Sequence, residues 1–270
     1  MHKSVKIVAL VVGAIFFLSA TLDVAPDIAN ISVVALSGGN GVKVRWSSIA
    51  PYSSGCWGKT EDWLYALYLD GKLVADSLEE PEYDLYEYGH IIEVVGFCSA
   101  EETKPAKISV ASVDVTEFTV YELNGEGASG IGFYPAAKSI AAYMMSDSTN
   151  CDDIDCYFTN WLDYSGGFGG TYYLASANRV IYDPGYSGGV TGWRSTGITE
   201  ALDVSGIENV EVVPELGYAS VADSVEAGET YAILTQNGYY GLIQVMDIDT
   251  INGQIDIKAT FQPIQRLRWM

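Results

Sequence analysis

Four aspartates lie within a stretch of nine residues and could bind a metal. The segment "DSTNCDDIDC" contains Asp147, Asp152, Asp153 and Asp155. Calcium prefers several oxygen ligands from one loop, so these residues are candidate calcium ligands. The alternative is a solvated acidic turn, because the spacing of an EF-hand loop is absent. No other cofactor is predicted.

Aromatic side chains gather in the glycine-rich stretch that follows. Rings beside Gly and Ser form adaptable contact surfaces, and long glycine-rich loops often carry function. Alternatively, the rings fill a core beneath a long loop. The residues proposed to bind a ligand are Trp161, Tyr172, Tyr182 and Trp193.

Catalytic chemistry has little support in this chain. His2 lies in the N-terminal leader, so His90 is the single histidine left to act as a general base. No nucleophile elbow, zinc-protease motif or phosphate-binding loop occurs. Paired carboxylates can hydrolyse glycosides without histidine. The clustered candidates are Glu200, Glu208, Glu211 and Glu215. We predict that the protein is not an enzyme, with a carboxylate-dependent polysaccharide hydrolase as the alternative.

The four cysteines predict two disulfides in an exported chain. Four cysteines allow three pairings. Cys151 and Cys156 are five residues apart, which favours a small closed loop between them and leaves Cys56 to pair with Cys98.

The N-terminus predicts export. Residues 1–20 carry Lys3 and Lys6 before an unbroken apolar run, which is typical of a signal peptide; the alternative is an uncleaved anchor. Residues 21–28 form a linker, and Asn30 begins an N-x-S sequon that is a candidate for glycosylation. We therefore expect an extracellular or cell-surface protein that contacts a membrane only through an uncleaved leader.

The net charge of the chain limits the kinds of molecule that it can bind. The 270 residues include 14 Lys and Arg against 35 Asp and Glu, for a net charge of −21. Such a surface repels nucleic acid and anionic lipid. We expect other surface proteins, glycans or copies of the chain itself as partners.

Short strands at regular spacing predict an all-β fold. Apolar residues alternate in "VKVRWSS", and Asp70-Gly71 predicts a tight hairpin in "DWLYALYLDGKLVAD". The strand over residues 63–69 is apolar on both faces, so we expect it to be covered on both. Residues 29–115 then form a β-sandwich and residues 116–265 a second β-rich domain with long Gly/Tyr-rich loops, before a tail at 266–270.

Residues 29–115 resemble a fibronectin type III (immunoglobulin-like) domain. The matching features are "VRWSS" with Trp46 in the second strand, "YALYLDGKLVAD", and "HIIEVVGFC" with "KPAKISV" as the last two strands. The tyrosine that the family usually has in its penultimate strand is missing. The resemblance implies that Trp46 packs between two sheets, that Cys56 and Cys98 lie at the same end of the sandwich, and that the domain is adhesive or a spacer.

The C-terminal strands more distantly resemble HmuY-like haem-scavenging proteins, through "ETYAILTQNGYYGLIQVMDID". A two-histidine haem site within one mature chain is impossible here, since only His90 remains after the leader. The whole sequence predicts a non-catalytic binding or structural protein, such as an adhesin or a subunit of an extracellular assembly. A carbohydrate-binding accessory protein is a further alternative.

Overall fold

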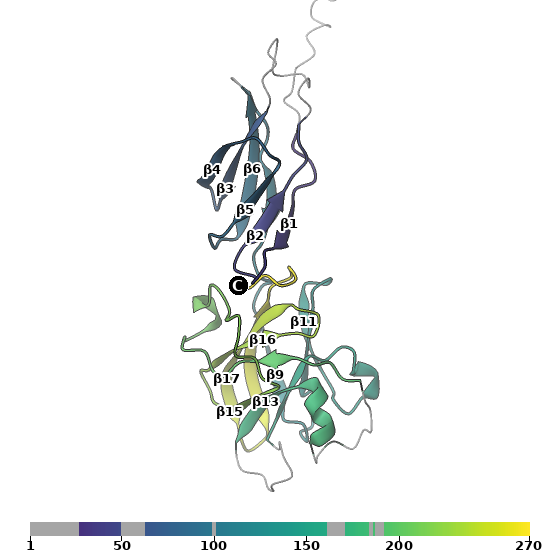
Figure 1. The fold of residues 1–270 in the computed structure, drawn as a ribbon. Helices are drawn as coiled ribbons and strands as arrows, with labels where there is room; N and C mark the ends of the chain where they lie inside the picture. The colour runs from purple at the N-terminus through teal and green to yellow at the C-terminus, as the bar shows by residue number, and fades with distance from the viewer. Residues whose placement is uncertain (1–26, 50–62, 99–100, 161–170, 184–185, 187–191) are drawn as a thin grey trace, which may run out of the picture. The chain divides into compact units, whose positions relative to one another are not determined.

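The protein is all-β, as the sequence predicts. The computed structural model describes residues 27–49, 63–98, 101–160, 171–183, 186 and 192–270 (Figure 1). The helices in these ranges are three short 3-10 segments, and none of their helices is long and apolar enough to cross a membrane. The predicted leader at 1–20 lies outside the described residues, as does Cys56.

The chain divides into two compact units. The first comprises residues 1–31, 46–81 and 93–107, and the second residues 32–45, 82–92 and 108–270. The predicted domain boundary at residue 115 stays a prediction.

The first unit is built on an antiparallel sheet in the order β4-β3-β6-β7, with β8 also paired to β6. Asp70 and Gly71 both have positive φ, 50° and 78°, so the predicted tight turn joins β3 to β4. Trp46 packs edge-on against Tyr65, with ring centroids 5.4 Å apart. Most of β3 is buried, with neighbouring residues buried on both of its faces. The strands are β3 (Leu64–Leu69), β4 (Lys72–Leu78), β6 (Ile91–Cys98), β7 (Glu101–Glu102) and β8 (Ala106–Ser109).

The second unit contains a small sheet and two larger ones. The small sheet has the order β1-β2-β5, from strands β1 (Ser32–Ala35), β2 (Val42–Arg45) and β5 (Glu82–Leu85). One five-stranded sheet has the order β11-β10-β12-β13-β15, and the other β14-β16-β17-β18-β9.

The strands of the first five-stranded sheet are β10 (Gly130–Tyr134), β11 (Ser139–Tyr143), β12 (Cys156–Thr159), β13 (Tyr172–Ser176) and β15 (Val221–Val225). Those of the second are β9 (Thr116–Tyr121), β14 (Gly197–Ile198), β16 (Thr230–Leu234), β17 (Tyr240–Asp249) and β18 (Gln254–Phe261).

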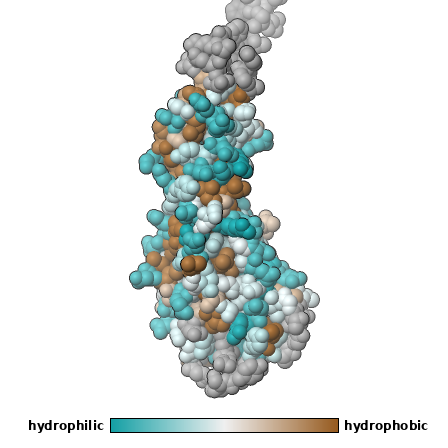
Figure 2. All heavy atoms as spheres, in the orientation of Figure 1, coloured by the Kyte–Doolittle hydropathy of each residue, from teal (hydrophilic) through white to brown (hydrophobic). Residues whose placement is uncertain are grey.

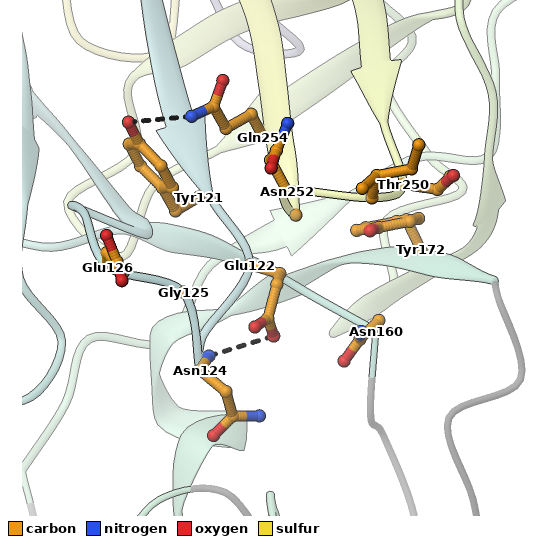
Figure 3. A pocket seen from close by; sticks show the side chains of 12 residues that line it. Tyr121, Glu122, Asn124, Gly125, Glu126, Asn160, Tyr172, Thr250, Asn252 and Gln254 are labelled. Atoms are coloured by element: carbon orange, nitrogen blue, oxygen red, sulfur yellow. Dashed lines mark hydrogen bonds between the residues drawn. The ribbon is translucent and has the colours of Figure 1, made fainter.

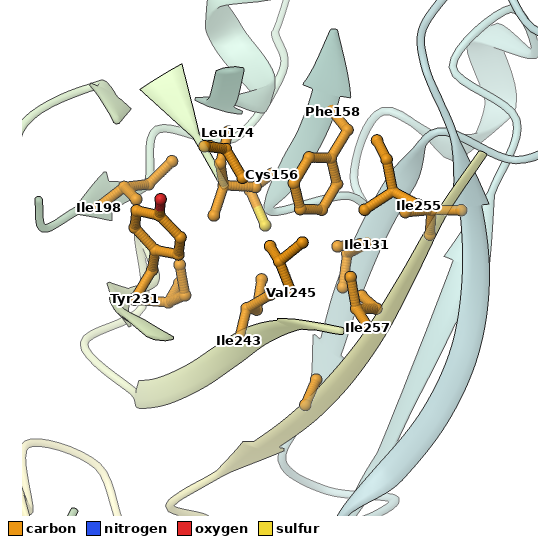
Figure 4. Close-up of a cluster of buried hydrophobic side chains, with 14 of the residues drawn as sticks. Ile131, Cys156, Phe158, Leu174, Ile198, Tyr231, Ile243, Val245, Ile255 and Ile257 are labelled. Atoms are coloured by element: carbon orange, nitrogen blue, oxygen red, sulfur yellow. The ribbon is translucent and has the colours of Figure 1, made fainter. Parts of the chain in front are cut away.

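The two five-stranded sheets share one hydrophobic core (Figure 4). Alternate residues of each strand point into it, as the two-residue repeat of a strand requires. Sheet one contributes Ile131, Cys156, Phe158 and Leu174, and sheet two contributes Tyr231, Ile243, Val245, Ile255 and Ile257.

The outer face of each sheet is partly covered as well. Tyr157 and Ala175 pack with Trp193 and with the 3-10 helix η2 (Ala177–Tyr182) in a second cluster. Ala232 and Leu242 pack with η3 (Ile207–Asn209) in a third. This double coverage explains why all four residues of β12 are buried. Over the face shown in Figure 2, the remaining exposed hydrophobic residues are interspersed with hydrophilic ones.

Residues 266–270, predicted as a tail, pack into the second unit. Leu267 and Trp269 are buried, and the Gln262 Nε2 donates to the Trp269 carbonyl at 2.9 Å. Arg268 donates from Nε to the Gly38 carbonyl at 2.6 Å and from its backbone N–H to the Gly39 carbonyl at 2.9 Å. The C-terminal segment is therefore an integral part of the unit.

Buried phenols predict that the fold is lost at alkaline pH. Burial raises the pKa of Tyr157, and burial followed by the hydrogen bond to Glu229 raises the pKa of Tyr231. In the unfolded chain both titrate near pH 10, so above about pH 10 the unfolded state holds fewer protons and the free energy of unfolding falls. Urea denaturation at increasing pH checks this, and Tyr157→Phe should flatten the dependence. An equal pH dependence of the free energy of unfolding in the wild type and in Tyr157→Phe would contradict it.

Candidate functional site

The four aspartates predicted to bind calcium have separate roles. Asp147 caps the 3-10 helix η1 (Ser148–Asn150) and accepts from the Thr149 backbone N–H at 2.9 Å. Asp152 is exposed and Asp153 is half-buried. Within the described ranges, no group of three or more His, Cys, Asp or Glu side chains could hold a metal ion. The calcium site stays a prediction, and the described residues do not bring its proposed ligands together.

Asp155 instead holds the fold together. Its side chain is 1% exposed and accepts from the Phe133 backbone N–H at 2.9 Å, while Arg194 Nη1 lies 3.3 Å from Oδ2. Burial raises the pKa of Asp155, against the opposing effects of the Phe133 hydrogen bond and the Arg194 charge. Asp155 thus connects β10 to the segment that contains Arg194.

The predicted disulfide between Cys151 and Cys156 is wrong. Both thiols are free. Cys156 points into the core between the sheets, whereas Cys151 packs against the cluster on the outer face of the same sheet. The two thiols therefore belong to different layers, which their short separation in sequence could not reveal. Cys98 does form a disulfide bond, and its predicted pairing with Cys56 lies outside the described residues.

The predicted aromatic ligand-binding residues do not form one patch. Trp193 is 5% exposed in the outer cluster, and Tyr182 is exposed with the Arg179 guanidinium 4.9 Å above its ring. Tyr172 is largely buried at the start of β13 and also lines a pocket. Trp161 lies outside the described residues.

Other predicted candidates lie on the surface. Glu200, Glu208, Glu211 and Glu215 are all exposed, and none lines the pocket. His90 is exposed with its Nε2 2.9 Å from the Tyr88 hydroxyl. Asn30 is exposed, and its Nδ2 donates to Ser47 Oγ at 3.1 Å, so glycosylation there stays a prediction.

A polar pocket of about 480 Å³ lies where elements of both five-stranded sheets meet (Figure 3). One side is the end of β9 and the turn after it, the second is the turn between β17 and β18, and the third is the end of β12 and the start of β13. The lining residues are Tyr121, Glu122, Asn124, Gly125, Glu126, Asn160, Tyr172, Thr250, Ile251, Asn252, Gly253 and Gln254.

Hydrogen bonds connect the first two sides. Gln254 Nε2 donates to the Tyr121 hydroxyl at 3.2 Å (Figure 3). The Glu122 backbone N–H donates to the Gly253 carbonyl at 2.8 Å. Gly253 has φ +63°, and a Cβ there would lie 2.8 Å from the Glu122 Cγ. Glycine therefore allows the two turns to approach closely.

Asp249 shapes the β17–β18 turn. Its carboxylate accepts from the Asn252 side-chain amide at 2.6 Å and from the backbone N–H groups of Ile251 and Asn252. These bonds, the side-chain one first, hold the pKa of Asp249 below its ordinary range. Asn252 is thereby held in a defined position at the pocket wall.

The pocket has a negative interior. Glu122 is 8% exposed and its Oε2 accepts from the Asn124 backbone N–H at 3.0 Å. In the described part of the chain no Lys, Arg or His forms an ion pair with Glu122 or Glu126, and the pocket lining contains none of these residues. Burial, followed by the charges of Glu122 and Asp249, raises the pKa of Tyr172.

Asn160 adds an unused acceptor to the lining. Its Oδ1 is buried and, among the residues that the structure describes, has no hydrogen-bond partner. A buried polar atom without a partner costs free energy, which a donor from a bound molecule would recover. The pocket thus combines two aromatic rings, side-chain amides and two carboxylates, a set that suits a ligand with many hydroxyl groups.

Sequence reasoning found only part of this site. Tyr172 was predicted to bind a ligand. The remaining lining residues were missed because they come from four distant segments. The signal that could have drawn attention to them is the run "YELNGEG", which concentrates polar side chains and glycine at the end of a strand.

Comparisons with known proteins do not indicate a function for this chain. No family model and no curated protein matches the chain. Among solved structures, it is similar to a DUF4466 family protein from Parabacteroides merdae, with a TM-score of 0.39 and 11% identity over 90% of this chain and 96% of that one.

Removal of the arginine partner of Asp155 should destabilise the fold. Arg194→Met leaves a buried carboxylate without its cation, so we expect the free energy of unfolding to fall by about 2–3 kcal/mol at neutral pH. Urea denaturation measures the loss. The matched control is Arg45→Met, which breaks an exposed pair with Glu82 and should cost under about 1 kcal/mol. Equal losses in the two variants would contradict the structural role of Asp155.

The cysteines predict a labelling pattern. Burial, with the nearby charge of Asp155, raises the pKa of Cys156 well above the ordinary thiol value, which makes this thiol unreactive in the folded chain. We expect alkylation without reductant to modify Cys156 only after unfolding, Cys151 more readily, and Cys98 not at all. Peptide mass spectrometry provides the readout. A peptide cross-linked between Cys151 and Cys156 would contradict the structure.

Proposed function

We propose that this chain is an exported, non-catalytic binding protein and that the polar pocket of its second unit binds a glycan. The observation that carries the proposal is the pocket lining. Its acceptor and donor side chains are already held in place, by the bond between Tyr121 and Gln254 and by the Asp249 turn, before any ligand arrives. Preorganised polar groups with adjacent rings are what binding without chemistry requires.

Sugar hydroxyls donate and accept hydrogen bonds at once. Amides such as Asn252 and Asn160 can both donate and accept, and carboxylates such as Glu122 and Glu126 accept. The side chains of Tyr121 and Tyr172 offer ring surface to the apolar faces of a sugar. A volume of about 480 Å³ falls in the usual range for small-molecule sites. It would accommodate a short glycan segment.

Export is supported by the leader that the sequence predicts at residues 1–20 and by the disulfide at Cys98, since disulfides persist in oxidising compartments. We propose that residues 29–115, whose strands fall in both compact units, form a fibronectin III-like spacer. The tight Asp70-Gly71 turn and the burial of Trp46 against Tyr65 support this.

One observation favours the alternative of a polysaccharide hydrolase. Glu122 and Glu126 both line the pocket, and two carboxylates suffice for glycoside hydrolysis. Chromatography of the glycans after incubation with the protein distinguishes a hydrolase from a binding protein, because a hydrolase would release shorter oligosaccharides.

The proposal predicts that pocket variants lose glycan binding and keep their fold. On a glycan array and then by calorimetry with the full chain, Tyr121→Ala and Asn160→Ala should weaken binding by about tenfold each, as one ring contact or one hydrogen bond to a buried acceptor is lost. Glu211→Gln, an exposed site outside the pocket, is the matched control and should bind normally.

Circular dichroism confirms that each variant is folded. The proposal fails if no glycan class binds the full chain, or if the glycans that bind do so equally well to the wild type and to both pocket variants.

A further inference from the structure

The most buried charge in the pocket, on Glu122, has no counter-cation among the residues that the structure describes. Glu122 is 8% exposed, and its carboxylate accepts a hydrogen bond from a neutral backbone N–H, on Asn124. A buried carboxylate without a paired cation is costly, and a cation delivered by a ligand would relieve that cost.

Other negative charges around Glu122 also favour a cationic ligand. Glu126 lines the pocket, and the Asp249 carboxylate is close enough to act together with Glu122 on the Tyr172 hydroxyl. The chain as a whole carries a net charge of −21, so its long-range field also attracts cations. A glycan that bears carboxylates or sulfates would be repelled.

The pocket lining also contains an acceptor that no described donor uses. This acceptor is the buried Oδ1 of Asn160, and a protonated amine presents three donors. An amine placed between Glu122 and Asn160 would form one charge-assisted bond and satisfy one unpaired acceptor.

We propose that the sugar recognised by this pocket carries a protonated primary amine, so that the ligand is a basic amino-sugar glycan. This inference rests on the proposed glycan-binding function. Glu122 supplies the charge that selects the amine, and Asn160 accepts a second hydrogen bond. The remaining lining residues contact the hydroxyl groups that any sugar offers.

The test compares three oligosaccharides of equal length by calorimetry with the full chain. They are a glucosamine oligomer with free amines, its fully N-acetylated counterpart and a neutral glucose oligomer. We expect the free amine to improve affinity by about tenfold over the other two at low salt, and the advantage to shrink at about 0.5 M salt as the charges are screened.

Glu122→Gln isolates the charge. Glutamine keeps an oxygen that can accept from the Asn124 N–H, so the fold should persist while the preference for the amine disappears and affinity for the neutral oligomer remains. Glu211→Gln should retain the full preference. A loss of preference in both variants would show that overall charge, and not Glu122, makes the selection.

The other outcomes are equally decisive. If all three sugars bind alike, the inference about the amine is wrong and the glycan-binding function stands. If none of the three binds, the inference about the amine is wrong, and the proposed function fails as well only if no glycan class on the array binds the full chain. If a linear polyamine competes as effectively as the glucosamine oligomer, the pocket recognises charge alone and an amino sugar is not its specific ligand.

Discussion

The packing of two five-stranded sheets against each other is the constraint from which the second unit follows. Alternate residues of ten strands meet in one core, and a close-packed interior admits only small changes in the distance between the sheets. That distance determines how far the turns at the sheet ends stand apart. Pocket residues contributed by β9 and by the β17–β18 turn are thus held at a defined separation from Asn160 and Tyr172, which belong to the other sheet.

The segments that cover the outer faces of the two sheets explain why some strands are buried on both faces, which a simple two-layer sandwich would not explain. Strand β12 is buried on both sides because Tyr157 faces a second cluster with Trp193 and η2. Strand β16 is covered in the same way by η3 and by the C-terminal Met270. Irregular segments therefore serve as outer layers of the unit, and this is where two of the predicted ligand-binding aromatics, Tyr182 and Trp193, are found.

The buried carboxylates of Asp155, in the interior, and Glu122, in the pocket, differ in whether a cation compensates their charge. Asp155 is buried with a backbone donor and with Arg194 beside it, so its charge is compensated within the chain. Glu122 is nearly as buried and has no such cation among the described residues. The chain has only 14 basic residues. One of them, Arg194, pairs with Asp155, whereas in the described part of the chain none pairs with Glu122. That contrast is the physical basis for proposing a ligand at Glu122 rather than at the aspartate-rich loop.

The sequence alone determined the all-β class and the hairpin at Asp70-Gly71, because strand alternation and turn chemistry are local properties. It could not determine which residues share a layer. Cys151 and Cys156 are close in sequence but face opposite sides of one sheet, whereas Glu122 and Asn160 are distant in sequence and line one pocket. Only the tertiary structure decides such matters, since the pairing of strands and the stacking of sheets depend on contacts between residues far apart along the chain.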